Sequence, residues 1–322
     1  MGDALIHSFI FDAKGRARPA SLDDVRAWRP GGGERLWVHL DVSHPDTRAW
    51  LEKEAGLPPL VADALLAEET RPRSSIIQDA LLIFLRGVNL NPGADPEDMV
   101  SIRLWVEQDR VISTRRRQLL SVLDTVESLA AQPLEGTGDL LLRIIMRMVD
   151  RINDVVDDLE IQVADLEQDV LEEPAPVMRA RLADLRRESI SLKRYLAPQR
   201  DALMRLPSEA PAWIGDRDKL HLREISDRMV RLVEDIDTVR ELAAVVNEEL
   251  VSMLSDQLNK RMYLLSIVAA LFLPLGFLTG LLGINVGGIP GADNPSAFWL
   301  FSGALVCILA VQVFFLSRRK WF

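Results

Sequence analysis

The alternation of apolar and polar positions changes character twice along the chain, at residues 138 and 261. In the first stretch, residues 1–138, short apolar runs rich in β-branched and aromatic residues are bounded by turn-forming residues, which is typical of strands. Two segments between them have the spacing of amphipathic helices. This mixture predicts a domain of the α+β class, with strands at 5–11, 36–40, 76–88, 99–106 and 110–114 and helices at 47–55 and 59–69.

The second stretch, residues 139–261, has helical periodicity throughout. Residues 139–171 lack Gly and Pro and predict one long helix. A second helix is predicted over 177–206, with Pro198 kinking it or ending it early. After Gly215 the chain has no Gly or Pro before Pro274, so a third helix is predicted to run without a break into the next stretch.

Residues 262–322 contain two uncharged apolar runs, 262–282 and 298–317. Each has about 20 residues, enough for a helix to cross roughly 30 Å of hydrocarbon. They predict a two-helix transmembrane hairpin joined by a loop over 283–296. Basic residues flank the spans on the side away from this loop, which predicts that both termini are cytoplasmic; they are Lys260, Arg261, Arg318, Arg319 and Lys320.

The third long helix carries two different stripes. One is apolar with alternating spacings of four and three residues, which predicts a packing seam; it consists of Ile225, Met229, Leu232, Ile236, Val239, Ala243, Val246, Leu250 and Met253. The other is polar and partly acidic outside the spans, with Glu234, Thr238, Glu241, Val245, Glu248, Ser252, Ser255 and Asn259. Within the first span the same spacing selects mostly small residues: Met262, Ser266, Ala269, Leu273, Gly276, Gly280 and Gly283.

The small-residue stripe has two interpretations. Glycine and alanine allow close packing of helices in a membrane, or several copies around an axis would turn the stripe into a pore wall. The polar continuation outside the membrane favours the pore, in which Met262 and Leu273 form apolar constrictions that gate by dewetting. Asn259 would close its cytoplasmic end. The acidic positions Glu234, Glu241 and Glu248 would form a funnel that concentrates cations, although a solvated helix face is the commoner explanation of such a stripe.

Composition narrows the function classes. The formal net charge of -10 argues against a nucleic-acid partner, which requires a basic face. A single cysteine, Cys307, rules out a disulfide framework. Residues 1–138 contain no Gly-rich phosphate loop, no His/Asp/Ser arrangement and no metal-ligand cluster, so we expect neither an enzyme nor a resident cofactor. A membrane-anchored signalling or scaffold protein remains as a remote alternative.

The loop Gly283-Ile284-Asn285, placed between two spans after a long helix, resembles the signature of the CorA metal-ion transporter superfamily. The usual form of this signature is Gly-Met-Asn. Its extension through Gly291 is similar to that of the ZntB zinc transporter branch, as are the segments 66–73 and 86–93 and the terminal Lys320-Trp321-Phe322. Ile284 in place of methionine disfavours magnesium as the main substrate.

This resemblance implies a funnel-shaped homopentamer in the bacterial inner membrane. The first span would line the pore, and Gly283, Ile284 and Asn285 would form its outer mouth. The transported ion would be a divalent cation, with zinc indicated by the resemblance and a magnesium, cobalt or nickel channel of the same superfamily as the alternative. A ring of Asn285 side chains can hydrogen-bond the waters of a hydrated cation; as a turn former, Asn285 also suits the loop itself.

Overall fold

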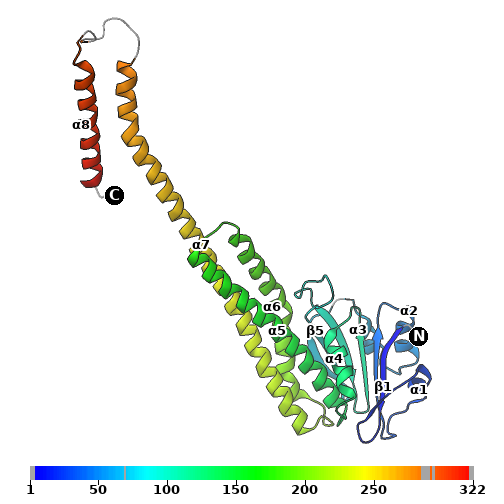
Figure 1. Ribbon diagram of the computed structural model, residues 1–322. Helices are drawn as coiled ribbons and strands as arrows, with labels where there is room; N and C mark the ends of the chain where they lie inside the picture. The colour runs from blue at the N-terminus through cyan, green and yellow to red at the C-terminus, as the bar shows by residue number, and fades with distance from the viewer. Residues whose placement is uncertain (1–3, 69, 284–290, 292–293, 319–322) are drawn as a thin grey trace. The chain divides into compact units, whose positions relative to one another are not determined.

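The computed structural model describes residues 4–68, 70–283, 291 and 294–318. The chain divides into two compact units, Met1–Glu248 and Glu249–Phe322. Figure 1 shows the strands in the first unit and the C-terminal helix α8 in the second. The helix α7, Asp216–Leu282, contributes residues to both.

Within the described residues, the first unit contains a seven-stranded sheet of order β2-β1-β3-β7-β6-β5-β4. β3 and β7 pair in parallel, with Val38 opposite Ile112, whereas the other neighbouring pairs are antiparallel. The strands are β1 Leu5–Phe11, β2 Ala17–Pro19, β3 Arg35–Asp41, β4 Arg73–Ile77, β5 Ala80–Gly87, β6 Val100–Val106 and β7 Arg110–Arg115.

Three short helices cover one face of the sheet: α1 Leu22–Ala27, α2 Pro45–Lys53 and α3 Pro59–Leu66. Val25, Trp50 and Val61 from these helices share a buried core with Leu82 and Trp105 from the strands. The side chain of Ser21 caps α1 by accepting a hydrogen bond from the Asp24 amide, which satisfies one of the free N–H groups of the first turn. Burial of the apolar strand positions on this side fixes the register of the sheet.

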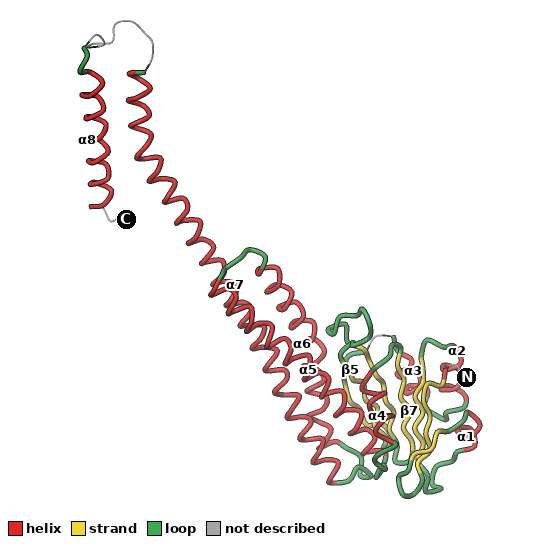
Figure 2. The backbone as a smooth tube through the Cα atoms, viewed as in Figure 1, coloured by secondary structure: helices red, strands yellow, loops and turns green. Residues whose placement is uncertain are grey.

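Longer helices complete the first unit. They are α4 Leu120–Leu129, α5 Thr137–Glu172 and α6 Met178–Glu209. α5 packs on β5 and β6, and α6 packs on β4 and β5. Figure 2 shows α5 and α6 alongside the first part of α7 as a helical layer beside the sheet.

The apolar stripe of α7 is a packing seam, as its spacing predicts. Its members from Ile225 to Leu250 are at most 4% exposed. Polar contacts at the edges of the seam add to it: Nζ of Lys193 on α6 lies 2.6 Å from the Asp237 carboxylate, and Arg228 lies 2.8 Å from Asp150 on α5. The seam is therefore used within one chain to bind α7 to α5 and α6.

The second unit contains the end of α7 and the helix α8, Ala297–Arg318. Both helices are long and apolar enough to cross a membrane, and their apolar stretches are almost wholly unburied in the single chain. Because such an apolar surface is unstable in water, the exposed side chains of Leu264, Phe272, Phe277 and Phe298 suit a lipid environment. The two predicted spans are thus confirmed as helices.

The prediction of a single strand over 76–88 is wrong. β4 ends at Ile77 and β5 begins at Ala80, with a tight turn at Gln78 and Asp79 between them. Both turn residues have positive φ, 51° and 66°, a conformation usually taken by Gly or Asn. The turn therefore lacks its usual sequence signal, and the apolar run conceals it.

Several helix boundaries also differ from the predictions. Pro198 and Pro207 lie inside α6, which continues to Glu209, because its neighbours Leu196 and Leu203 are fully packed and hold the helix together. α3 ends at Leu66 rather than at residue 69. The short elements β2 and α1, and the helix α4, had no predicted counterpart. The predicted domain boundaries at 138 and 261 stay predictions.

Candidate pore and ion-binding site

The small-residue stripe of α7 lies on the side of the helix away from α8. α8 contacts α7 at Ala270, whose carbonyl oxygen lies 3.5 Å from Nε2 of Gln312. Nearby Ile267 is 6% exposed. Gly276 follows Ile267 by nine residues, about two and a half helical turns, so the two positions point in opposite directions.

Close helix packing within the hairpin does not explain the glycines of the stripe. Beyond the backbone of its own helix, a Cβ atom added to Gly276 or Gly280 would meet no described atom within 4 Å. Met262 and Leu273, the predicted apolar constrictions, are 66% and 71% exposed. Ser266 and Ala269 are exposed as well. The stripe thus forms one exposed helix face.

The hydroxyl groups along this part of α7 bond to their own helix. Ser266 donates to the carbonyl oxygen of Met262 at 2.8 Å, and Thr279 donates to that of Leu275 at 3.0 Å. Such bonds satisfy the hydroxyl proton and leave the oxygen available as an acceptor. Of the two, only Ser266 belongs to the predicted stripe, which therefore offers an uncharged oxygen acceptor rather than tight metal ligands.

At the predicted outer mouth, α7 ends at Leu282, and the Gly283 amide donates to the carbonyl oxygen of Thr279 at 2.9 Å. This bond closes the last turn of the helix. Ile284 and Asn285 lie outside the described residues, so their roles at the mouth remain predictions.

The acidic stripe is exposed in the first unit. Glu234, Glu241 and Glu248 all project away from the buried seam of α7. Further carboxylates lie beside this stripe: burial, followed by the charges of Asp235 and Asp157, raises the pKa of Glu160 on α5. Burial and the neighbouring charges of Glu234 and Asp157 also raise the pKa of Asp235. The mutual repulsion of these carboxylates is the kind of charge that attracts cations, although Glu241 of the stripe is paired with Arg240 at 3.5 Å.

No tight metal site accompanies this charge in the described part of the chain. Groups of three or more His, Cys, Asp or Glu side chains with metal-binding geometry are not found among these residues. Several acidic side chains of α5 are instead paired with arginine: Asp150 with Arg228 and Asp139 with Arg143. Asn259, the predicted cytoplasmic end of the pore, is exposed.

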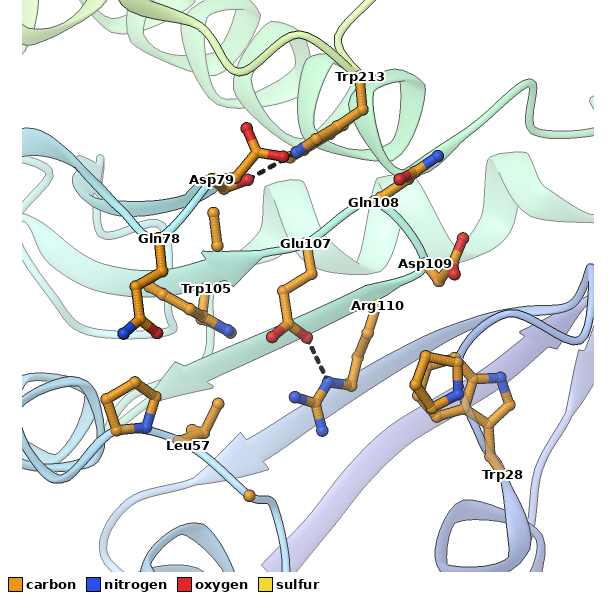
Figure 3. Close-up of a pocket in the computed structure, with 14 residues that line it drawn as sticks. Trp28, Leu57, Gln78, Asp79, Trp105, Glu107, Gln108, Asp109, Arg110 and Trp213 are labelled. Atoms are coloured by element: carbon orange, nitrogen blue, oxygen red, sulfur yellow. Dashed lines mark hydrogen bonds and ion pairs between the residues drawn. The ribbon is translucent and has the colours of Figure 1, made fainter.

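A separate hollow of about 460 Å³ lies at one end of the sheet. As Figure 3 shows, Trp28, Trp105 and Trp213 form part of its wall, and the carboxylate of Glu107 faces the guanidinium of Arg110. The Nε–Oε2 distance of this pair is 2.6 Å, so each charge is neutralised by the other. None of the residues predicted to carry function lines this hollow.

Sequence comparison decides the family. A family model described as "CorA-like Mg2+ transporter protein" matches residues 33–319, which is most of the chain. The chain belongs to the CorA-like family. The resemblance of the chain to this family is therefore confirmed.

Relatives place the chain near the ZntB branch of the CorA family. It is 37% identical to the zinc transport protein ZntB of Yersinia enterocolitica over 98% of this chain and 95% of the relative. It is 38% identical to the divalent cation transporter CmaX of Pseudomonas aeruginosa over 98% of this chain and 96% of the relative. The structure of full-length CmaX matches with a TM-score of 0.87 at 37% identity, covering 100% of this chain and 99% of that one.

One polar residue of the second unit was not singled out from the sequence. Gln312 is an amide inside an uncharged and mostly apolar span, and the structure places it against α7 at Ala270. The sequence did offer a signal for Gln312. A polar side chain in lipid costs free energy, so such residues are rare in membrane spans unless they have a hydrogen-bond partner.

Proposed function

We propose that this protein transports divalent metal cations, with zinc preferred, through a pore enclosed by five copies of the chain. The observation that carries the proposal is the exposed small-residue face of α7 on the side away from α8, where a Cβ atom added at Gly276 or Gly280 would meet no described atom within 4 Å beyond its own helix. A wall of this kind encloses a path only when further copies surround it. The relatives named for zinc and divalent-cation transport support the choice of substrate.

In this proposal the acidic stripe lies at the cytoplasmic end of the pore. It therefore acts on a cation either before the cation enters the membrane or after it leaves. Glu234, Glu241 and Glu248 raise the local concentration of divalent cations by electrostatic attraction. Along the pore, the uncharged face of α7 provides hydroxyl and carbonyl oxygen atoms that bind the waters of a hydrated ion. Met262 and Leu273 close the path by excluding water.

The outer mouth is assigned to Gly283, Ile284 and Asn285. An amide oxygen accepts hydrogen bonds from coordinated water without replacing it, which suits cations that release water reluctantly. Both termini are assigned to the cytoplasm of a bacterial inner membrane on the basis of the flanking basic residues. A span without Asp, Glu or His offers no obvious proton relay, which favours passive movement down the gradient of the ion; proton coupling through the first unit is the alternative.

The test uses the full-length protein in liposomes that contain a zinc-sensitive dye. External zinc is supplied with and without excess magnesium, and Asn285→Ala is measured in parallel. Zinc influx that resists magnesium and falls in the variant supports the proposal. Absence of flux for every divalent cation, from a protein whose pentameric mass has been verified, would refute the pore and leave the hairpin as an anchor.

A magnesium channel is the second candidate, because the matching family model carries that description. The same liposomes separate the two. If modest magnesium abolishes zinc influx, and a magnesium-sensitive dye reports influx of magnesium itself, the protein is a general divalent-cation channel rather than a zinc transporter.

A further inference from the structure

Pro274 interrupts the hydrogen bonding of α7 in the middle of the proposed pore wall. The helix continues through this proline to Leu282. Proline has no backbone N–H, so the carbonyl oxygen four residues earlier, that of Ala270, loses its usual helical donor. In the hydrocarbon core no water is available to replace that donor, and an unsatisfied backbone group there is strongly unfavourable.

Gln312 of α8 lies at this carbonyl group. Its Nε2 atom is 3.5 Å from the oxygen of Ala270. Only the amide nitrogen can donate to a carbonyl group, so the orientation of the side chain follows from the contact. The contact is long for a hydrogen bond. It nevertheless joins the Gln312 amide, a donor that requires a partner in lipid, to the Ala270 carbonyl oxygen, the acceptor that Pro274 leaves without its helical donor.

The position of the contact relates it to the pore. Pro274 lies between Leu273 and Gly276, two members of the exposed stripe. A proline break permits a helix to bend, and a bend at this point would move the stripe toward or away from the pore axis. A donor supplied from α8 limits that movement.

We propose that Gln312 is a positioning residue for the pore: it binds the Ala270 carbonyl group released by Pro274 and thereby fixes the bend of α7 at the pore wall. This inference rests on the proposed transport function. It assigns α8 a specific task beyond anchoring, because α8 supplies the hydrogen bond that the pore helix lacks.

The test is a double-mutant cycle on the full-length protein, with Gln312→Met, Pro274→Ala and the double variant. Methionine has nearly the shape of glutamine but no N–H. Alanine at 274 restores the backbone N–H, so Ala270 regains its helical partner and Gln312 becomes dispensable. Two quantities are measured for each protein: the concentration dependence of zinc influx into liposomes, and the melting temperature of the oligomer in detergent.

In the wild-type background, Gln312→Met is expected to lower the maximal influx about threefold, and up to about twentyfold, if influx scales with the population of the correctly bent helix; these factors convert the stabilities of interhelical hydrogen bonds in membranes. The zinc concentration giving half-maximal influx stays unchanged, because Gln312 does not touch the ion. In the Pro274→Ala background the same change is expected to alter the maximal influx less than about twofold. The melting temperature follows the same pattern.

Ser302→Ala is the matched control, since it removes a polar atom from α8 at a position ten residues before Gln312, about 15 Å along the helix. It leaves both quantities at wild-type values. The proposal is overturned if Gln312→Met has the same effect in both backgrounds. It is also overturned if neither variant that carries Gln312→Met assembles. If the wild type itself carries no zinc, the transport proposal fails, while the melting-temperature cycle still tests the contact.

Discussion

The indole N–H of Trp213 donates a 2.8 Å hydrogen bond to the backbone oxygen of Asp79. Trp213 lies in the loop between α6 and α7, and Asp79 lies in the turn between β4 and β5. The bond thus joins the helical layer to a turn in which both central residues have positive φ. Left-handed backbone conformations of residues other than glycine cost about 1 kcal/mol or more each, and contacts of this kind help to maintain them.

Replacing Asp79 with glycine is expected to stabilise the first unit by about 0.5–1 kcal/mol, because glycine adopts φ near 66° without steric cost. The Trp213 bond survives, since it uses the backbone oxygen. Thermal unfolding of the full-length protein followed by tryptophan fluorescence measures the effect. Ser75→Gly, within β4, is the control and is expected to lower stability. If Asp79→Gly also lowers stability, the backbone at Asp79 is not strained.

Stability of the first unit is expected to fall as the pH drops below about 6.5. His39 is fully buried, and its Nδ1 lies 2.8 Å from Oγ of Ser113. Burial, with smaller contributions from Arg115 and His7, holds the pKa of His39 well below its ordinary value of 6.5. The unfolded chain therefore binds a proton that the folded chain does not, so this contribution is complete above pH 6.5 and is lost as the pH falls toward the folded pKa.

The slope of this loss is at most about 1.4 kcal/mol per pH unit for one proton. His39→Asn keeps an acceptor near Ser113 and removes the titration, so melting temperatures measured between about pH 7.5 and 5.5 should change less than in the wild type. His221→Gln, at an exposed position, serves as the control. Identical pH profiles for His39→Asn and the wild type would show that His39 does not contribute.

A bulky side chain at Gly276 is expected to reduce zinc influx at least about tenfold by narrowing the pore. Folding of the single chain is unaffected, because a Cβ atom there meets no described atom within 4 Å beyond the backbone of its own helix. Gly303 of α8 has the same open surroundings, so Gly303→Leu is a control with the same change on the other helix. If zinc influx into liposomes is the same for Gly276→Leu and Gly303→Leu, the stripe does not line the pore.

Neutralising the acidic stripe is expected to reduce zinc influx mainly at low salt. In the triple variant Glu234→Gln, Glu241→Gln, Glu248→Gln, influx should fall about two- to tenfold at about 10 mM ionic strength and little at about 0.5 M, because salt screens exposed charges. A triple variant at acids elsewhere is the control: Glu34→Gln, Asp63→Asn and Glu209→Gln, all exposed. Equal loss in both variants would indicate a general charge effect instead of a funnel.

The sequence was most informative where one periodicity persists over many residues. Helix α5 and most of α7 follow from runs without Gly or Pro, and the seam from Ile225 to Leu250 is buried as its spacing predicts. The spans follow from the absence of charge over about 20 residues. In each case many positions point to the same structure, so a single exception does not change the result.

Features decided by one or two residues were harder to predict. The turn at Gln78 and Asp79 has no glycine to mark it, and packing at Leu196 and Leu203 overrides Pro198. The partner of Gln312 depends on a carbonyl group 42 residues away in sequence. Such features arise from tertiary contacts, which local propensity does not encode.

The open surroundings of Gly276 also have a genetic consequence. If five copies share one path, and if one leucine at position 276 is enough to block that path, an allele encoding Gly276→Leu should be dominant over the wild type. With equal synthesis and random mixing of two alleles, only about 3% of closed five-membered rings contain no defective copy. Co-expression in one cell would therefore abolish nearly all transport, whereas independent monomeric carriers would retain half.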